Sequence, residues 1–157
     1  MSMFQGKRFE DLKVEDVYQL VSASPAKLQK NARIHEVLSA MLEHPTSRKV
    51  YVIDVEGNLA GVIRTETLLK LIGFREGVRQ NTAPSFIHML KDLQKESAES
   101  VMEKVRPVKR VTSLKDALEL MVEDHVNDLP VVDDDYKLIG ELRTLELFQA
   151  ALELFDK

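Results

Sequence analysis

The chain has 157 residues, 44% of them hydrophobic and 31% charged, a mixture typical of globular proteins that bury a core without disulfides or metals. It contains no cysteine, which excludes disulfide frameworks, thiolate catalysis and cysteine zinc sites. Its net charge of −4 argues against a nucleic-acid partner, and no apolar run approaches the roughly 20 residues of a membrane span. The first residues contain no apolar core of signal-peptide length, so we expect a cytoplasmic protein.

The first half of the chain predicts a β-α-β-β-α unit. A short extended piece around Lys27–Gln29 precedes a helix with an apolar stripe at helical spacing. The stripe consists of Ile34, Val37, Leu38, Met41 and Leu42. Two strand-like runs follow, joined by the polar turn Glu56–Asn58. A second helix begins near Thr65 and carries Leu68, Leu69, Leu71 and Ile72.

Residues 74–96 predict a linker that contains a helix. Gly73, Gly77 and Pro84 indicate the end of one helix, a loop and a new start. Phe86, Leu90 and Leu93 then form an apolar stripe.

The second half predicts the same order of elements. An extended piece around Val108–Val111 precedes a helix for which Thr112 and Ser113 offer N-cap oxygens. The apolar stripe of this helix consists of Leu114, Ala117, Leu118, Met121 and Val122. Two strands joined by the turn Asp134–Tyr136 lead to a helix that begins near Thr144. That last helix carries Leu147, Phe148, Ala151, Leu152 and Phe155.

The two halves are copies of one unit. "VYVID" (Val50–Asp54) aligns with "LPVVD" (Leu129–Asp133), and "GVIRTET" (Gly61–Thr67) with "GELRTLE" (Gly140–Glu146). Upstream, "EDVY" aligns with "ESVM", which places the copies at residues 12–73 and 97–155. Neither copy is long enough to cover both faces of its sheet. The sequence therefore predicts an α/β (α+β) fold of two β-α-β-β-α motifs packed about a pseudo-twofold axis.

The repeated arginine lies where a strand ends and a helix begins. A helix N-terminus presents unpaired N–H groups and partial positive charge, which suit phosphate. Arg64 and Arg143 would add a bidentate fork for phosphate oxygens. Thr65 and Thr144 stand where a hydroxyl can cap the helix or contact a ligand. The alternative for both arginines is a surface side chain or a salt bridge to an acid of the other half.

In its ordered series of motifs the chain resembles a tandem pair of CBS domains, also called a Bateman module. The resemblance is carried by "SLKDALELMVEDHVNDLPVVDDDYKLIGELRTLELF" and, more loosely, by "RIHEVLSAMLEHPTSRKVYVIDVEGNLAGVIRTETLL". It implies two clefts between the motifs that bind AMP, ADP, ATP or S-adenosylmethionine as regulatory ligands, with no required cofactor. It also implies a homodimer that regulates an enzyme or a transporter.

The family's ligand signature runs glycine, two hydrophobic residues, Ser or Thr, two free positions and Asp. Here Arg64 and Arg143 occupy the Ser/Thr position, which contacts phosphate, and Thr67 and Glu146 occupy the Asp position, which holds the ribose hydroxyls. Glu146 has one more methylene than the aspartate, and Thr67 is a weak substitute for it. The alternative for Glu146 is an acid favoured by the helix dipole alone.

The loop before the middle strand differs between the copies. It carries Arg48 and Lys49 in the first copy and Asn127 and Asp128 in the second. In the family this loop leans toward the phosphates, so phosphate should prefer the cleft that Arg48 and Lys49 line. The alternative is a solvated pair of charges in a turn.

No other constellation points to chemistry. His44 and His125 recur at the ends of matching helices, which favours a complement to the C-terminal helix dipole over metal binding. Asp133–Asp135 is typical of an acidic hairpin turn. The leading hypothesis is a stand-alone regulatory module that senses an adenine nucleotide. Its rivals are a dimerisation or interaction protein with vestigial clefts and, with no catalytic constellation to support it, an enzyme.

Overall fold

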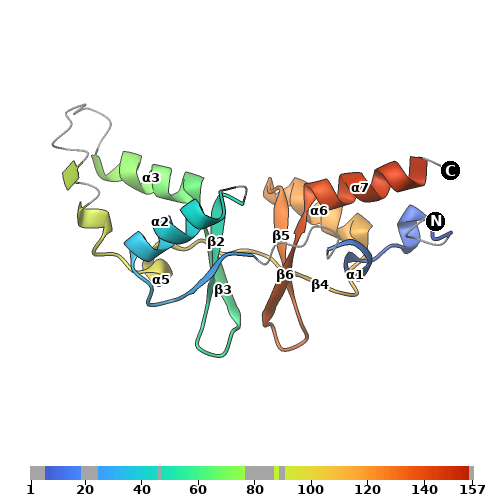
Figure 1. Ribbon diagram of the computed structural model, residues 1–157, viewed down its shortest axis with the longest axis horizontal. Coiled ribbons are helices and arrows are strands. Elements are labelled where there is room, and N and C mark those ends of the chain that lie inside the picture. Colours follow the sequence, from blue (N-terminus) through green and yellow to red (C-terminus); the bar gives the residue numbers. More distant parts are fainter. Residues whose placement is uncertain (1–5, 19–24, 46, 77–86, 89–90, 156–157) are drawn as a thin grey trace. The chain divides into compact units, whose positions relative to one another are not determined.

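The computed structural model describes residues 6–18, 25–45, 47–76, 87–88 and 91–155, with two compact units (Figure 1). The central unit is formed by residues 25–104. The split unit is formed by the described parts of residues 1–24 and 105–157. Each unit has its own sheet and core.

The central unit contains a three-stranded sheet in the order β1-β2-β3. Its elements are β1 (Lys27–Gln29), α2 (Ile34–Glu43), β2 (Lys49–Ile53), β3 (Leu59–Arg64), α3 (Thr65–Glu76) and α5 (Ala98–Val101). β1 pairs with β2 in parallel, across the helical crossover α2, whereas β2 and β3 form an antiparallel hairpin. This is the predicted β-α-β-β-α order.

The split unit repeats this plan with a sheet in the order β4-β5-β6. Its elements are the 3₁₀ turn η1 (Phe9–Asp11), α1 (Val14–Val17), β4 (Val108–Lys109), α6 (Leu114–Asp124), β5 (Asp128–Val132), β6 (Leu138–Arg143) and α7 (Thr144–Phe155). β4 pairs with β5 in parallel and β5 with β6 antiparallel. The register of the hairpin matches that of the central unit: Asp128 lies opposite Arg143 as Lys49 lies opposite Arg64.

The short helices are exchanged between the sequence copies. α1 comes from the first copy but packs in the split unit, where the N–H of Leu114 donates to the carbonyl of Leu12 at 3.0 Å. α5 comes from the second copy but packs in the central unit, where Val62 and Glu103 exchange two backbone hydrogen bonds of 2.9 Å. These backbone bonds hold α1 against the sheet of the second repeat and α5 against the sheet of the first. The compact units therefore differ from the repeats at residues 12–73 and 97–155.

Only part of each predicted helix stripe is buried. Ile34, Val37 and Met41 of α2 and Leu114, Ala117 and Met121 of α6 lie in the cores. Leu38, Leu42, Leu118 and Val122 are exposed, as are Leu69 of α3 and Phe148, Leu152 and Phe155 of α7. These helices are apolar over a wider arc than the face that a three-stranded sheet can cover.

Local signals explain the ends of the elements. Ser113 Oγ accepts from the N–H of Asp116 at 3.1 Å, which confirms the predicted N-cap of α6; Thr112 Oγ1 instead accepts from the N–H of Lys109. His44 and His125 are the C-cap residues of α2 and α6, which confirms their predicted position at the ends of the two helices. Asp133 Oδ1 accepts from the N–H groups of Asp135 and Lys137, so the acidic run is the predicted hairpin turn.

The predicted linker helix lies largely outside the described residues, as do Phe86 and Leu90. Residues 87–88 and 91–93 are helical, and Leu93 packs in the core of the central unit with 2% of its surface exposed. None of the helices in the described ranges is long and apolar enough to span a membrane.

Candidate functional site

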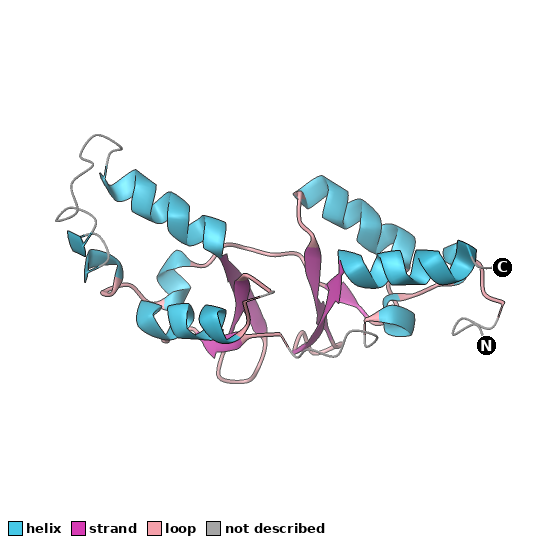
Figure 2. Ribbon diagram, turned by 45° about the horizontal axis from the view of Figure 1, so that its top comes forward, coloured by secondary structure: helices cyan, strands magenta, loops and turns pink. Residues whose placement is uncertain are grey.

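Each unit has one strand-to-helix corner, and the chain builds the two in the same way. The central corner is formed by Arg64–Thr67, with Arg48 just before β2 and Lys49 as its first residue. The split corner is formed by Arg143–Glu146, with Asn127 just before β5 and Asp128 as its first residue. In both, the residue that ends the strand is followed directly by the first residue of a helix (Figure 2). The loop before the middle strand is tied to that helix, because the N–H of Thr65 donates to the carbonyl of Arg48 at 3.2 Å. The N–H of Thr144 donates in the same way to the carbonyl of Asn127 at 2.9 Å.

The side chains predicted to hold ribose help to start the helices. The N–H of Arg64 donates to Thr67 Oγ1 at 3.2 Å, and the N–H of Arg143 donates to Glu146 Oε2 at 3.1 Å. This is the back-reaching half of a capping box, in which the third helical residue accepts from the residue before the helix. The simple N-cap alternative for Thr65 and Thr144 is wrong, because their hydroxyls donate to Glu66 Oε2 and to the carbonyl of Asn127.

Each of the two arginines has an acidic partner. Arg64 Nη1 lies 3.6 Å from Glu103 Oε2, and this pair is partly exposed, with 24% and 44% of the two side chains accessible. Arg143 Nε donates to Glu141 Oε1 at 3.1 Å, and the Glu141 side chain is only 1% exposed. Exposed ion pairs contribute little and exchange partners readily, whereas a buried charged hydrogen bond is held firmly. The fork of Arg64 is therefore the freer of the two.

The charge at the two corners has opposite sign. Lys49 is buried and lies directly opposite Arg64 across the β2–β3 ladder, with the exposed Arg48 next to it. Like charges in directly opposed positions are unfavourable unless a counter-charge lies near them. At the split corner Asp128 faces Arg143, and the neighbouring acids Glu141 and Glu146 are both buried. Of the eight predicted site residues, the structure places five at the central corner and three at the split corner, and the two corners carry unlike charge.

Glu146 is the most constrained of these residues. Its side chain is fully buried and, among the described residues, its Oε1 atom has no hydrogen-bond partner. Burial raises the pKa of this carboxyl to about 7, and the negative charges of Glu141 and Asp128 act in the same direction. The hydrogen bond from Arg143 N–H and the charge of Arg143 lower this pKa only in part.

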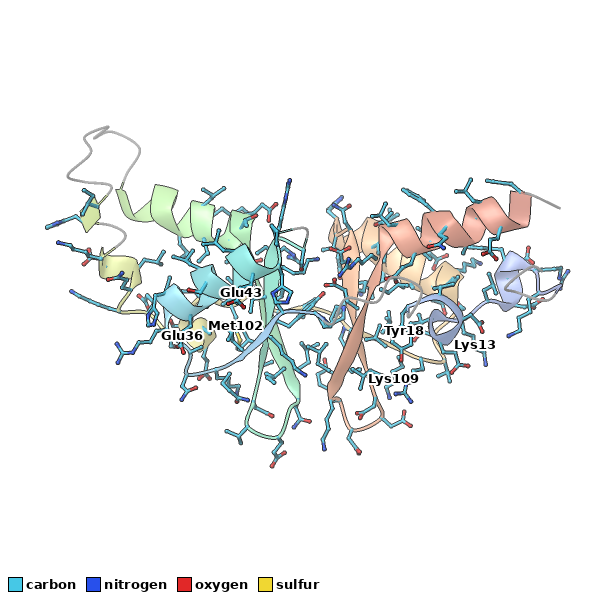
Figure 3. All side chains as sticks on the ribbon, in the orientation of Figure 1. Lys13, Tyr18, Glu36, Glu43, Met102 and Lys109 are labelled. Carbon is cyan, nitrogen blue, oxygen red and sulfur yellow. The ribbon has the colours of Figure 1, made fainter. Side chains whose placement is uncertain are left out.

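The signature glycines serve packing in this structure. A Cβ atom on Gly61 would lie 2.7 Å from the carbonyl oxygen of Glu103 and 2.8 Å from Met102 Sδ. A Cβ atom on Gly140 would lie 2.9 Å from two ring carbons of Tyr18. Figure 3 labels Met102 and Tyr18, each beside the sheet of its unit. The sequence signal for this contact was the "EDVY"/"ESVM" repeat, in which Tyr18 and Met102 are equivalent.

No group of three or more His, Cys, Asp or Glu side chains within the described ranges is arranged to hold a metal ion.

A family model described as CBS domain matches residues 14–73 and, a second time, residues 98–153. The chain belongs to the CBS domain family. It is a tandem CBS pair, and both matches include the corner of their copy. A search of curated proteins finds no match to this CBS pair.

Solved CBS structures resemble the pair over nearly its whole length. A CBS domain-containing protein from Thermotoga maritima is 29% identical, covers 91% of this chain and 96% of its own, and superposes with a TM-score of 0.73. CBSX2 from Arabidopsis thaliana is 24% identical with a TM-score of 0.73, over 93% of this chain and 98% of its own. A structure of CBSX2 in complex with AMP is 25% identical with a TM-score of 0.67, over 91% and 98% of the two chains.

Proposed function

We propose that this CBS pair is a stand-alone regulatory module that binds an adenine nucleotide or a related adenosyl compound at its strand-to-helix corners. The observation that carries the proposal is the pair of helix N-termini, each preceded by an arginine, in a family with a member solved in complex with AMP. Ligand binding would bias the conformation of the pair by the difference in affinity for its states and so signal to a separate enzyme or transporter.

Phosphate is proposed to bind at the central corner. Arg48, Lys49 and Arg64 supply three cations there, and the Arg64 pair with Glu103 is open enough to exchange for a phosphate oxygen. An arginine binds phosphate through two parallel N–H groups, which a lysine cannot do. AMP, ADP or ATP would satisfy this site.

Titration calorimetry of AMP, ADP and ATP tests the proposal. Arg64→Ala should weaken binding about tenfold or more, because a hydrogen bond to a charged group contributes roughly 1.5–3 kcal/mol. Arg143→Ala should change it less, since that arginine already pairs with Glu141. Arg33→Ala is the matched control, an exposed arginine at the start of α2. Equal affinity in all three variants would argue against a role for the corners.

A second candidate, a dimerisation or interaction protein, is favoured by an exposed apolar face on the split unit. α6 and α7 lie side by side in both ribbon views (Figures 1 and 2). Six of their large apolar side chains are 41–80% exposed: Leu118, Val122, Leu145, Phe148, Leu152 and Phe155. At these exposures six such side chains offer roughly 400 Å² of apolar surface, about half of the roughly 800 Å² per partner of a stable dimer, and polar groups around them would supply the rest. We propose that a second copy of the chain covers this face about a twofold axis.

Sedimentation of Phe148→Glu tests this homodimer. The substitution should give a monomer, because it places a charge in the middle of the apolar face. Leu69→Glu is the control, at the equivalent position of the central unit, where Glu66 replaces Leu145 and the face is less apolar. A wild-type monomer, or dimers in both variants, would contradict this interface.

The proposed role includes no chemical step and is placed in the cytoplasm. Incubation with ATP followed by chromatography should return ATP unchanged. Nucleotide turnover that is lost in Arg64→Ala would contradict the proposal, and cell fractionation checks the location.

A further inference from the structure

The acids of the split corner leave it poorly suited to phosphate. Asp128 lies opposite Arg143, Glu141 accepts from Arg143 Nε at 3.1 Å, and Glu146 accepts from the backbone N–H of Arg143. Three acids therefore surround one arginine whose guanidinium already has a carboxylate partner. A phosphate group would have to displace Glu141, whose side chain is 1% exposed, and then approach the other two acids.

The same corner contains an acceptor that lacks a donor. Glu146 is fully buried and its Oε1 atom is unpartnered within the part of the chain that the structure describes. A buried polar atom without a partner is costly, and a ligand that brings an O–H, an N–H or a positive charge would relieve this cost. A phosphate oxygen brings only a further acceptor. Thr67, at the equivalent position of the central corner, is a neutral hydroxyl.

We propose that the split corner takes a nucleoside without phosphate, whose 5′ substituent is neutral or cationic, while phosphorylated nucleotides bind at the central corner. The inference rests on the proposed function, that the corners bind adenosine-type ligands. Oε1 of Glu146 accepts from the ribose hydroxyls, and Glu141 and Asp128 favour a positive charge on the 5′ side. The two corners of one chain thus sort adenosyl ligands by charge.

Calorimetry with three probes of equal base but different charge tests the inference: adenosine, S-adenosylmethionine and AMP. Glu146→Gln should weaken adenosine and S-adenosylmethionine about tenfold or more and leave AMP unchanged. Arg64→Ala should weaken AMP binding about tenfold or more and leave the binding of adenosine and S-adenosylmethionine unchanged. Thr67→Val is the matched control at the equivalent position and should leave S-adenosylmethionine unaffected.

A second variant tests the same inference without altering the buried acid. Asn127→Arg combined with Asp128→Lys copies the central loop into the split corner. It should raise the number of AMP molecules bound per chain and weaken S-adenosylmethionine.

The outcomes separate the two proposals. S-adenosylmethionine binding that depends on Arg64 and not on Glu146, or an unchanged AMP stoichiometry in the double variant, would overturn the charge sorting alone. Failure of all three probes to bind the wild-type chain would overturn the proposed function and the sorting with it.

Discussion

At the scale of single residues, the structure changes the meaning of the repeated motif. In the sequence, the arginines of "GVIRTET" and "GELRTLE" are interpreted as ligand contacts, and the glycines are only the first position of the family's ligand signature. In the folded chain each arginine has an acidic partner, and each glycine accommodates Met102 or Tyr18. Glu103, Met102 and Tyr18 come from other segments of the chain, so the motif does not show these contacts, whereas Glu141 lies within the motif, two residues before Arg143. Glu146 is the clearest example of a residue whose role the motif does not show, because its burial raises the pKa of its carboxyl.

Stability should depend on pH through Glu146. Its pKa in the folded chain is about 7, above the ordinary value of 4.5. Below pH 4.5 both states hold the proton. Between pH 4.5 and 7 the unfolded state releases it first, so rising pH favours unfolding, and above pH 7 the effect levels off. The free energy of unfolding of the wild type, relative to Glu146→Gln, should fall by about 1–3 kcal/mol over this window.

Urea unfolding of both proteins between pH 4 and 8 measures this difference, because the other titrating groups cancel in the comparison. Parallel stability curves would show that Glu146 does not titrate with a raised pKa.

Gly140→Ala should be tolerated only when the side chain of Tyr18 is truncated. Its added Cβ would lie 2.9 Å from the ring of Tyr18, so Gly140→Ala should destabilise the chain by about 1–3 kcal/mol. In a Tyr18→Ala background the same change should cost much less. A double-mutant cycle by chemical denaturation measures the coupling, and additive effects would argue against this packing role.

At the scale of elements, the two hairpin turns make the same aspartate hydrogen bonds but have different residues at the left-handed position. Asp54 Oδ1 accepts from the N–H groups of Glu56 and Asn58, as Asp133 Oδ1 does from Asp135 and Lys137. The left-handed position is Gly57 in the first turn, with φ of 89°, but Tyr136 in the second, with φ of 68°. The second turn is therefore strained where the first is not.

Tyr136→Gly should stabilise the chain by about 0.5–1 kcal/mol, because it removes the cost of a left-handed side-chain residue. Asp134→Gly is the control in the same turn, without a positive φ, and should be slightly destabilising. Thermal unfolding measures both. A lower melting temperature for Tyr136→Gly would show that the half-exposed tyrosine ring contributes more than the strain costs.

At the scale of the whole molecule, the exchange of α1 and α5 means that a repeat is not a folding unit. The core of the central unit lies entirely within residues 26–101. The core of the split unit needs Leu12, Val14, Val17 and Tyr18 from the beginning of the chain.

A fragment of residues 25–104 should therefore fold alone, whereas a fragment of residues 97–157 should not, since it lacks four buried core residues. Circular dichroism and amide-proton dispersion in NMR spectra check this. Cooperative unfolding of the 97–157 fragment would contradict the division into these units.

The sequence by itself determined the order of elements, the duplication and the family. Hydrophobic periodicity and turn residues are local signals, and both repeats of the chain contain them. Ile34, Val37 and Met41 could be assigned to a core from their spacing. Tertiary structure decided which of the wider apolar arcs is covered, which sheet each short helix joins, and that Glu141 and Glu146 become buried. These outcomes depend on contacts between segments that are distant in the sequence. The spacing of apolar residues can be read from the local sequence, but the burial of a side chain cannot, because it depends on which other segments pack against it.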